Sequence, residues 1–468
     1  MTPDVRITWR GLGVKMLASA AVMLMAAVFA REVNSDLMQF VARDPGVRPG
    51  PAGAGGMLSG LTALEQELFT SSLEAFEEVQ SVQGTIPNTD AGLGPRFNLD
   101  SCAGCHMQPA IGGTSPAENP QVEMAKKEGA ANVVPFFIKK EGPVREARFK
   151  YKPDGTPDGG VHGLFTITGR SDAHGCAISQ PDFLAAAARQ NLIFRIPTPV
   201  FGAGLIEAID DDTILMNMQA NSTMKQSLGI RGRPNTSGRP NTSGNDGTLT
   251  RFGWKAQNKS LELFSAEAYY VEQGVTNDVF PQERDETSGC LFNATPESSV
   301  HFDETNPIDV PSDVVKFAVF MRFLAPPTPA QDNASIIRGR KLFGDIGCAL
   351  CHTPTLHTGK VVVEALRNKD ANLYSDLLLH NMGSGLADDI SQGDARGDEF
   401  RTAPLWGFGK RIFFLHDGST RNLLEAIRAH ASQSDGRYPA SEANQVIAQF
   451  NRLPEPDKQN ILNFLRGL

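Results

Sequence analysis

The sequence predicts a mainly α-helical protein built from two similar domains, the first of which is enlarged by a long loop-rich insertion with some short strands. The pattern Cys-x-x-Cys-His occurs twice, at residues 102–106 and 348–352, and a stretch with helical hydrophobic spacing precedes each copy. Between the two copies, residues 107–324 carry many turn-forming Pro, Asp and Gly residues and no long helical period. Two domains and an insertion account for these observations.

Several segments carry local signals of regular structure. Thr62 and Glu65 form a capping box, and Leu and Phe residues follow it at helical spacing, so a helix is expected to start after Thr62. The other expected elements are helices at residues 182–192, 311–323, 335–343 and 456–468, and a strand around residues 164–168.

Composition narrows the function classes. The chain has 468 residues, 40% of them hydrophobic and 21% charged, which is typical of a folded globular protein. Its formal net charge is -9, and no Lys/Arg stripe is visible, so nucleic acid is not an expected partner. The negative charge leaves a basic electron-carrier protein open as a partner.

The N-terminus has the features of a secretion signal. Basic residues precede an apolar run over residues 16–29, and the small residues Val28 and Ala30 fit the positions before a signal-peptidase cut. Residues 1–30 are therefore expected to be a signal peptide, and the protein periplasmic with no membrane span in the mature chain. A retained N-terminal membrane anchor is the alternative.

The two Cys-x-x-Cys-His segments predict two covalently bound c-type haems. Two thiols three positions apart can form thioethers with the two vinyl groups of a porphyrin, and the next histidine is placed to ligate the iron. The attachment residues are Cys102 and Cys105 in the first copy and Cys348 and Cys351 in the second. The corresponding iron ligands are His106 and His352. A zinc ribbon or a thioredoxin-like redox pair would not require a histidine at that position both times.

The haem segments give each domain the character of a cytochrome c, in which an N-terminal and a C-terminal helix cross beside the haem. The expected organisation is a signal peptide at 1–30, a flexible Pro/Gly-rich tether at 31–60, an N-terminal haem domain with the insertion at 61–325, and a C-terminal cytochrome c-like haem domain at 330–468.

The remaining cysteines are Cys176 and Cys290. An oxidising compartment favours a disulfide between them, and two separate buried thiols are the alternative.

Several motifs resemble the bacterial di-haem c-type oxidoreductase family, also labelled peroxidase or "thiol oxidoreductase", which is related to the di-haem cytochrome c peroxidases. The motifs lie along most of the chain, at residues 102–106, 112–116, 119–121, 165–170, 201–207, 252–254, 322–327, 375–380, 401–406 and 414–418. The resemblance implies two cytochrome-like domains around an interface, and it defines the substrate less well than the architecture.

The second ligand of each iron decides between electron transfer and peroxide binding. Related peroxidases carry a similar His-Asp-Gly followed by a helix, with a methionine ligand where His430 falls, so the resemblance implies His430 as the second ligand of the C-terminal haem. The alternative places His430 on the polar side of a helix. For the N-terminal haem, the candidates are His162 and His174, and a purely structural role is the alternative for each. His162 comes first because its glycine neighbours allow close approach to a porphyrin.

A peroxidase also needs a group that moves protons between the peroxide oxygens. Glu207 lies in a glycine-rich apolar stretch, and Glu123 resembles a peroxidase glutamate by its surrounding motif. Both also fit the reading of ordinary surface carboxylates.

Two functions remain open. The first is a periplasmic di-haem oxidoreductase that transfers electrons between a soluble donor protein and a small oxidant such as peroxide. The second is a non-catalytic electron-transfer cytochrome with both haems six-coordinate.

Overall fold

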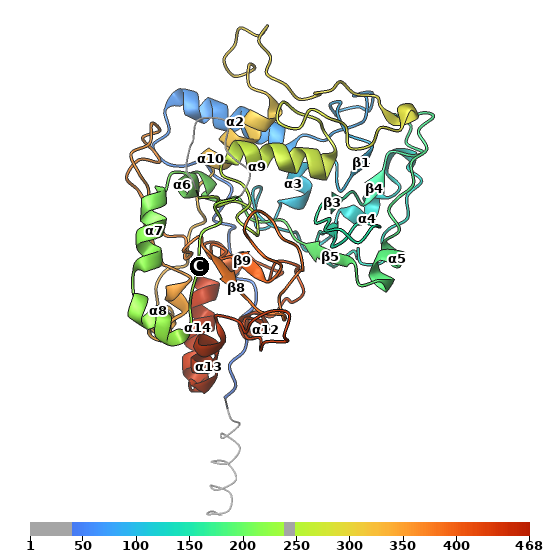
Figure 1. Ribbon diagram of the computed structural model, residues 1–468. Helices are drawn as coiled ribbons and strands as arrows, with labels where there is room; N and C mark the ends of the chain where they lie inside the picture. The colour runs from blue at the N-terminus through green and yellow to red at the C-terminus, as the bar shows by residue number, and fades with distance from the viewer. Residues whose placement is uncertain (1–39, 238–248) are drawn as a thin grey trace, which may run out of the picture.

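The computed structural model describes residues 40–237 and 249–468, so the expected signal peptide at residues 1–30 lies outside the described range. The described chain is rich in helices and has only short strands, as the sequence predicts (Figure 1). Among these residues, no helix combines the length and apolar composition that crossing a bilayer requires.

Two packed helices frame the first Cys-x-x-Cys-His segment. Helix α2 (Ala63–Glu77) begins at the predicted capping box and packs against α10 (Asp313–Phe323) at the top of Figure 1. The rings of Phe76 and Phe320 join the two helices, with centroids 4.6 Å apart. Both expected helices are therefore confirmed, and α10 closes the first unit.

Two further helices cross in the second unit. Helices α11 (Ala334–Asp345) and α14 (Glu455–Gly467) confirm the elements expected at 335–343 and 456–468. A Cβ on Gly339 of α11 would lie 1.9 Å from the carbonyl oxygen of Asn460 on α14. Only a glycine allows the two backbones to approach this closely.

The insertion is made of short helices and turns. Helix α3 (Cys102–Cys105) lies just before it and carries the first cysteine pair. The helical elements of the insertion are α4 (Gln121–Met124), η1 (Lys127–Gly129), α5 (Phe183–Ala188), α6 (Ala203–Glu207), α7 (Asp211–Gln219), α8 (Ser222–Leu228), α9 (Leu261–Ala268), the π-helix η2 (Tyr269–Gln273) and η3 (Ser288–Cys290). The C-terminal unit adds η4 (Cys348–Leu350), η5 (Phe408–Lys410), α12 (Leu423–Ala429) and α13 (Asn444–Arg452). The helix expected at 182–192 is shorter than predicted, because α5 ends at Ala188.

The largest sheet of the described residues has three strands in the order β3-β2-β5, all antiparallel. Its strands are β3 (Val161–His162), β2 (Glu146–Phe149) and β5 (Leu192–Arg195), at the right of Figure 1. The register pairs Glu146 with Arg195, so these two residues share one end of the sheet. The remaining sheets are pairs: β1 (Arg96–Phe97) with β4 (Phe165–Thr166), β6 (Leu356–His357) with β7 (Asp370–Ala371), and β8 (Leu379–Asn381) with β9 (Glu399–Arg401).

The insertion packs against the C-terminal unit. Helices α7 and α8 run down its side in Figure 1, and a bridge pairs Ile209 with Thr358. The buried guanidinium of Arg195 pairs with Asp388 at 2.6 Å. One hydrophobic core includes α2 and α10 together with residues such as Leu373 beyond the Pro-rich segment at 325–330. The division into 61–325 and 330–468 therefore stays a prediction.

A disulfide joins Cys176 to Cys290. The sequence favoured this bond, and it is confirmed; it closes a loop across a sequence separation of 114 residues.

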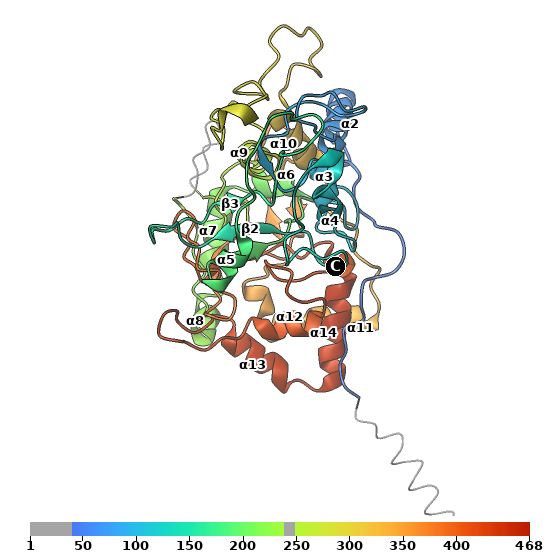
Figure 2. The ribbon, with the colours of Figure 1, turned by 90° about the vertical axis from the view of Figure 1, so that its right-hand side faces the viewer.

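The flexible tether expected at 31–60 is wrong for the part that the structure describes. From residue 42 onward, the segment is held by hydrogen bonds to distant elements, including Arg43 N to Gln459 Oε1 at 2.8 Å and Leu58 N to the Phe323 carbonyl at 2.7 Å. Figure 2 shows it running up the side of the molecule from α14 towards α2. Composition alone missed this order because the partners lie hundreds of residues away in the sequence.

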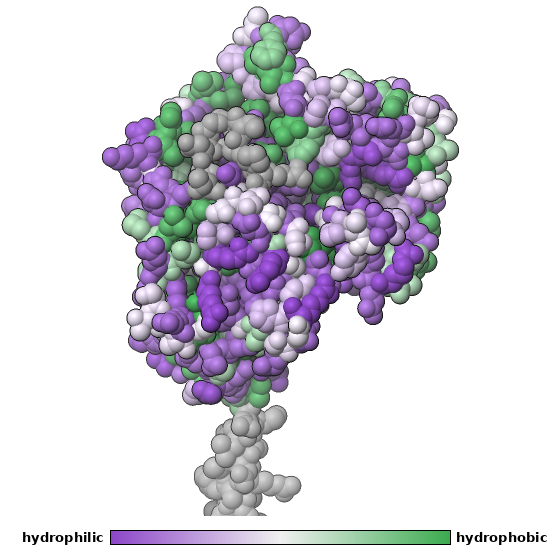
Figure 3. Space-filling model, in the orientation of Figure 1, coloured by the Kyte–Doolittle hydropathy of each residue, from purple (hydrophilic) through white to green (hydrophobic). Residues whose placement is uncertain are grey.

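Polar side chains cover most of the lower half of the face in Figure 3.

Candidate functional site

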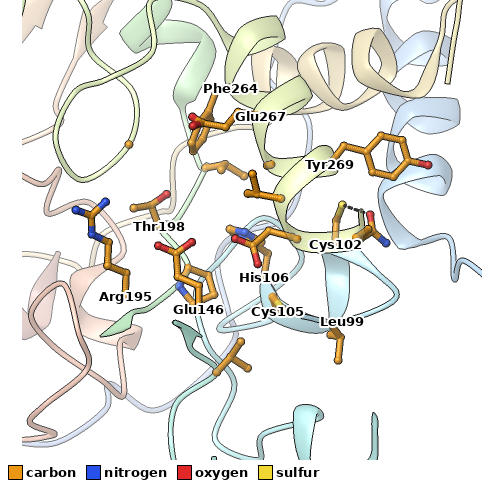
Figure 4. A pocket seen from close by; sticks show the side chains of 18 of the residues that line it. Leu99, Cys102, Cys105, His106, Glu146, Arg195, Thr198, Phe264, Glu267 and Tyr269 are labelled. Carbon is orange, nitrogen blue, oxygen red and sulfur yellow. Dashed lines mark hydrogen bonds between the residues drawn. The ribbon is translucent and has the colours of Figure 1, made fainter. Parts of the chain in front are cut away.

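The first cavity surrounds α3, which carries Cys102 and Cys105 and is followed directly by His106 (Figure 4). It holds about 1120 Å³ of empty space, the part open to solvent included. Its walls come from the sheet edge with Glu146 and Arg195 and from α9 and η2. In Figure 4 these elements converge on the space beside His106.

The hydrogen bonding of His106 prepares it to ligate iron. Its Nδ1 lies 2.8 Å from the carbonyl oxygen of Gly113. A carbonyl can only accept, so Nδ1 carries the proton and Nε2 keeps a free lone pair. Burial lowers the pKa of His106 to about 4, so the ring is neutral at neutral pH.

The second cavity surrounds the segment of Cys348, Cys351 and His352 and holds about 1400 Å³ of empty space, again with its open part included. Helices α11, α12, α13 and α14 each supply lining side chains. The Nδ1 of His352 lies 3.0 Å from the carbonyl oxygen of Tyr374, which again leaves Nε2 free. Burial, and then the nearby His430, lower the pKa of His352 to about 4.

The same cavity contains a second histidine with the same arrangement. His430 follows α12, lines the cavity, and has Nδ1 2.8 Å from the carbonyl oxygen of Ala426. Its Nε2 is therefore also free, and burial lowers its pKa. His352 and His430 line the same cavity. The structure thus brings together the two predicted ligands of the C-terminal haem.

The chemistry of the second cavity fits a haem. The buried guanidinium groups of Arg401 and Arg411 line it, and within residues 40–237 and 249–468 neither forms an ion pair. Burial lowers the pKa of each to about 10. Two buried cations without carboxylate partners match the two propionates of a haem. The cavity is otherwise lined mainly by apolar side chains.

The four cysteines expected to attach the haems line the two cavities. All four are half-buried and outside the disulfide. Burial raises the pKa of Cys102 and of Cys348 to about 12, so these thiols are neutral. Each pair therefore lies in its cavity beside a neutral histidine, as the attachment chemistry requires.

A pair of half-buried carboxyl groups faces the first cavity. Glu146 of β2 and Glu272 of η2 both line it and are hydrogen-bonded to each other. Burial, and then the neighbouring Glu146, raise the pKa of Glu272 well above its usual value, although Asn98 Nδ2 donates to its Oε2 at 2.6 Å. Burial opposes ionisation of Glu146 too, but Arg148 Nε, 2.6 Å from Glu146 Oε1, holds its pKa below the usual value. Burial therefore favours the protonated form of Glu272, and Arg148 favours the ionised form of Glu146.

Sequence reasoning missed this pair. Its members come from distant segments, and the only local signal is Arg148 two positions after Glu146, on the same face of a strand. The π-helix that carries Glu272 is an unusual element often found at functional sites.

Three predicted site residues lie outside both cavities. The ring of His162 stacks on Phe149 with centroids 3.9 Å apart, and its Nε2 lies 3.1 Å from Asp158 Oδ2. Glu207 accepts a hydrogen bond from Arg322 Nε at 2.7 Å and another from the Leu261 amide. Glu123 is exposed on α4. The structure does not bring any of them together with His106.

One side chain links the two cavities. Of the described residues, only Trp254 lines both. Its Nε1 donates to the Ile196 carbonyl oxygen at 3.0 Å, and its ring lies 6.4 Å from that of His416. The indole is therefore fixed between the two sites.

His380 also lines the second cavity, with Nε2 2.9 Å from Asp376 and Nδ1 2.9 Å from Glu442. The two carboxylates engage both of its nitrogens, which leaves none free for iron.

Comparison with known proteins gives a match to a family model. A family model described as "Di-haem oxidoreductase, putative peroxidase" matches residues 147–468. The matched range includes the second Cys-x-x-Cys-His segment, and the first lies before it. No sequence among the curated proteins matches this chain.

Three solved structures show a distant likeness. Hydrazine synthase of Kuenenia stuttgartiensis is 18% identical, with 35% of this chain and 56% of that chain covered and a TM-score of 0.23. The diheme peroxidase BthA from Burkholderia thailandensis is 15% identical, with 47% and 65% covered and a TM-score of 0.28. A MauG-like protein associated with microbial copper homeostasis is 17% identical, with 58% and 90% covered and a TM-score of 0.30. Scores this low carry no argument about this chain.

Proposed function

Because the chain belongs to the di-haem oxidoreductase family, as its motifs predict, we propose that it is an exported enzyme that passes electrons from a soluble donor protein to a small oxidant of the peroxide class. Two c-type haems are attached through the cysteine pairs, with His106 and His352 as iron ligands. The disulfide between Cys176 and Cys290 and the N-terminal signal support an oxidising compartment, the periplasm.

The difference between the two cavities carries the proposal. In the second cavity, His430 lines the same space as His352 and keeps Nε2 free, so it could supply the second ligand, and a haem held by both histidines would serve electron transfer. In the first cavity, the only histidine among the described lining residues is His106, and the carboxyl pair Glu146–Glu272 faces the same space. One haem is thus left open to an oxidant.

The first cavity supplies protons where the oxidant binds. A haem bound there would supply a redox iron with an accessible coordination position. Reduction of one peroxide to two waters consumes two electrons and two protons. Burial favours the protonated form of Glu272 and Arg148 favours the ionised form of Glu146, so one member can donate and the other accept a proton between the two peroxide oxygens.

The second cavity and Trp254 serve the electron path. His352 and His430 would hold the C-terminal haem, which would supply a redox iron to receive electrons from the donor protein. The indole of Trp254 lies on the walls of both cavities and provides an aromatic group along the path to the first haem.

A specific residue favours the electron-carrier alternative. Met321 of α10 lines the first cavity, and a thioether can act as a second haem ligand. Were Met321 bound to the first iron, both haems would be six-coordinate and the protein would only carry electrons.

Mixing the fully reduced protein with hydrogen peroxide in the absence of oxygen tests the proposal. We expect both haems to be oxidised by one peroxide per protein molecule, because the two haems together supply the two electrons. Reoxidation that is no faster than that of a six-coordinate cytochrome would favour the carrier.

A further inference from the structure

The N-terminal segment, residues 40–58, contacts the wall of the second cavity through Asp44, which binds the lining residue Leu423. Just before it, the Ala42 amide donates to Glu455 Oε2 at 2.8 Å, which fixes the segment on α14. Further along, Arg48 donates from its amide to the Gly409 carbonyl oxygen at 2.8 Å and from Nη2 to the Thr328 carbonyl oxygen at 2.9 Å. Asp44 is therefore held from both sides.

The carboxylate of Asp44 joins two helices that line the second cavity. Its Oδ2 accepts a hydrogen bond from the Leu423 amide at 2.7 Å, at the first residue of α12. Both its oxygens also accept from Arg466 of α14, Oδ1 from Nε at 2.8 Å and Oδ2 from Nη2 at 2.7 Å. Asp44 thus fixes α12 relative to α14.

Helix α12 depends on Asp44 for part of its first turn. The Asn422 side chain caps the amides of Leu424 and Glu425, and Asp44 supplies the acceptor for Leu423. Leu423 is buried and lines the cavity. The helix has seven residues, and His430 follows its last residue, so a shift at its start is carried to the imidazole.

Arg466 extends the same connection. It is buried, donates from Nη1 to the Arg411 carbonyl oxygen at 2.9 Å, and packs over the Phe414 ring at 4.9 Å. Arg411 and Phe414 both line the second cavity. The Asp44–Arg466 ion pair therefore connects α12, α14 and the loop that carries Arg411.

We propose that Asp44 is a positioning residue for His430: the N-terminal segment holds α12 where His430 can act as the second ligand of the C-terminal haem. The inference rests on the proposed function, in which that haem is closed by His430. The sequence predicts only a flexible tether here. The partners of Asp44 are Leu423 and Arg466, which lie 379 and 422 positions further along the chain, so these contacts form only in the folded protein.

Carbon monoxide binding to the reduced, haem-loaded, full-length protein tests the inference. The parent protein is expected to bind one carbon monoxide, at the first haem. Asp44→Ala removes both contacts, and we expect a second binding phase whose apparent affinity is about 10–100-fold higher than that of the closed haem, the usual size of an effect on a metal ligand's support. Asp44→Asn keeps an acceptor for the Leu423 amide but loses the charge beside Arg466, so a smaller second phase is expected.

A matched control lies on α14, in an ion pair with a different helix. Asp457 of α14 pairs with Arg338 of α11 at 3.0 Å and does not touch α12, so Asp457→Asn should keep one carbon monoxide. Unchanged binding in Asp44→Ala, or in Asp44→Asn if the alanine variant does not accumulate, would overturn the inference.

His430→Ala distinguishes failure of the positioning role of Asp44 from failure of the proposed closed second haem. If it opens the second haem and the Asp44 variants do not, only the positioning role fails. If His430→Ala itself leaves binding at one carbon monoxide, the closed second haem of the proposed function fails.

Discussion

The carboxyl pair in the first cavity gives the sharpest prediction, through the substitution Glu272→Gln. An amide has the shape of a protonated carboxyl group and can donate to Glu146 while accepting from Asn98, so both hydrogen bonds of Glu272 are retained. Because burial raises the pKa of Glu272 and so favours its neutral form, the neutral amide also resembles that form in charge. What it removes is the transferable proton.

The size of the effect follows from that single loss. General acid–base catalysis contributes about 10²–10⁴-fold to a rate, which corresponds to about 2.7–5.4 kcal/mol at about 1.36 kcal/mol per tenfold change. Glu146 remains as an ionised base, so we expect a fall in kcat/KM for peroxide of about 100-fold, at the lower end of that range. Haem content, optical spectrum and thermal stability should stay close to those of the parent protein.

The rate of reaction with peroxide is expected to depend on pH in a definite direction. The protonated form of Glu272 is the active acid, so the parent rate is expected to fall as pH rises through its raised pKa. The variant has no such group and should lack this descending limb. Stopped-flow reoxidation of the reduced protein by peroxide, measured across pH, checks both points.

The control for this experiment is Glu123→Gln, because Glu123 is exposed and lies outside the cavities. It should change kcat/KM by less than about twofold, as surface substitutions generally do little. The reasoning is refuted if Glu272→Gln keeps the parent rate and pH profile, or if Glu123→Gln loses as much activity.

Three further predictions concern the electron path, the attachment and the fold. Trp254→Phe should slow electron transfer between the haems without loss of haem, as followed by stopped-flow spectroscopy after reduction of one haem; an unchanged rate would remove Trp254 from the path. Replacing Cys348 and Cys351 together by Ser should lower covalent haem from two per chain to one in a pyridine haemochrome assay, and retention of both would contradict the attachment. Gly339→Val should lower the free energy of unfolding by at least about 1–3 kcal/mol, since a Cβ there would overlap the Asn460 carbonyl; thermal denaturation at parent stability would contradict the close helix crossing.

Local sequence patterns predicted the parts of the fold that depend on neighbouring residues. The capping box at the start of α2 and the apolar stripes of α11 and α14 are such patterns, and the structure contains all three helices. The Cys-x-x-Cys-His segments likewise fixed where each cavity lies, because their spacing is itself the chemical requirement.

The acid–base candidates show that local sequence patterns do not predict long-range contacts of a carboxylate. Glu207 lies in an apolar stretch, but its carboxylate forms an ion pair with Arg322, which lies far along the chain. Glu146 and Glu272 meet only because β2 and η2 pack around the same cavity, and no spacing in the sequence records that contact. Long-range pairing decides which carboxylate reaches the site.

The N-terminal segment shows a second reason. Pro and Gly residues indicate the absence of helix and strand, and the sequence therefore predicts a flexible tether. The structure has neither helix nor strand there, yet Asp44 and Arg48 hold the segment by contacts with distant residues. Irregular structure and mobility are separate properties.

The number of carbon monoxide molecules bound by the fully reduced protein tests the central claim, the difference between an open first haem and a second haem closed by His430. The account predicts one per protein molecule, with His430→Ala raising it to two. None in the parent protein would show that both irons are closed, and two would show that His430 does not close the second.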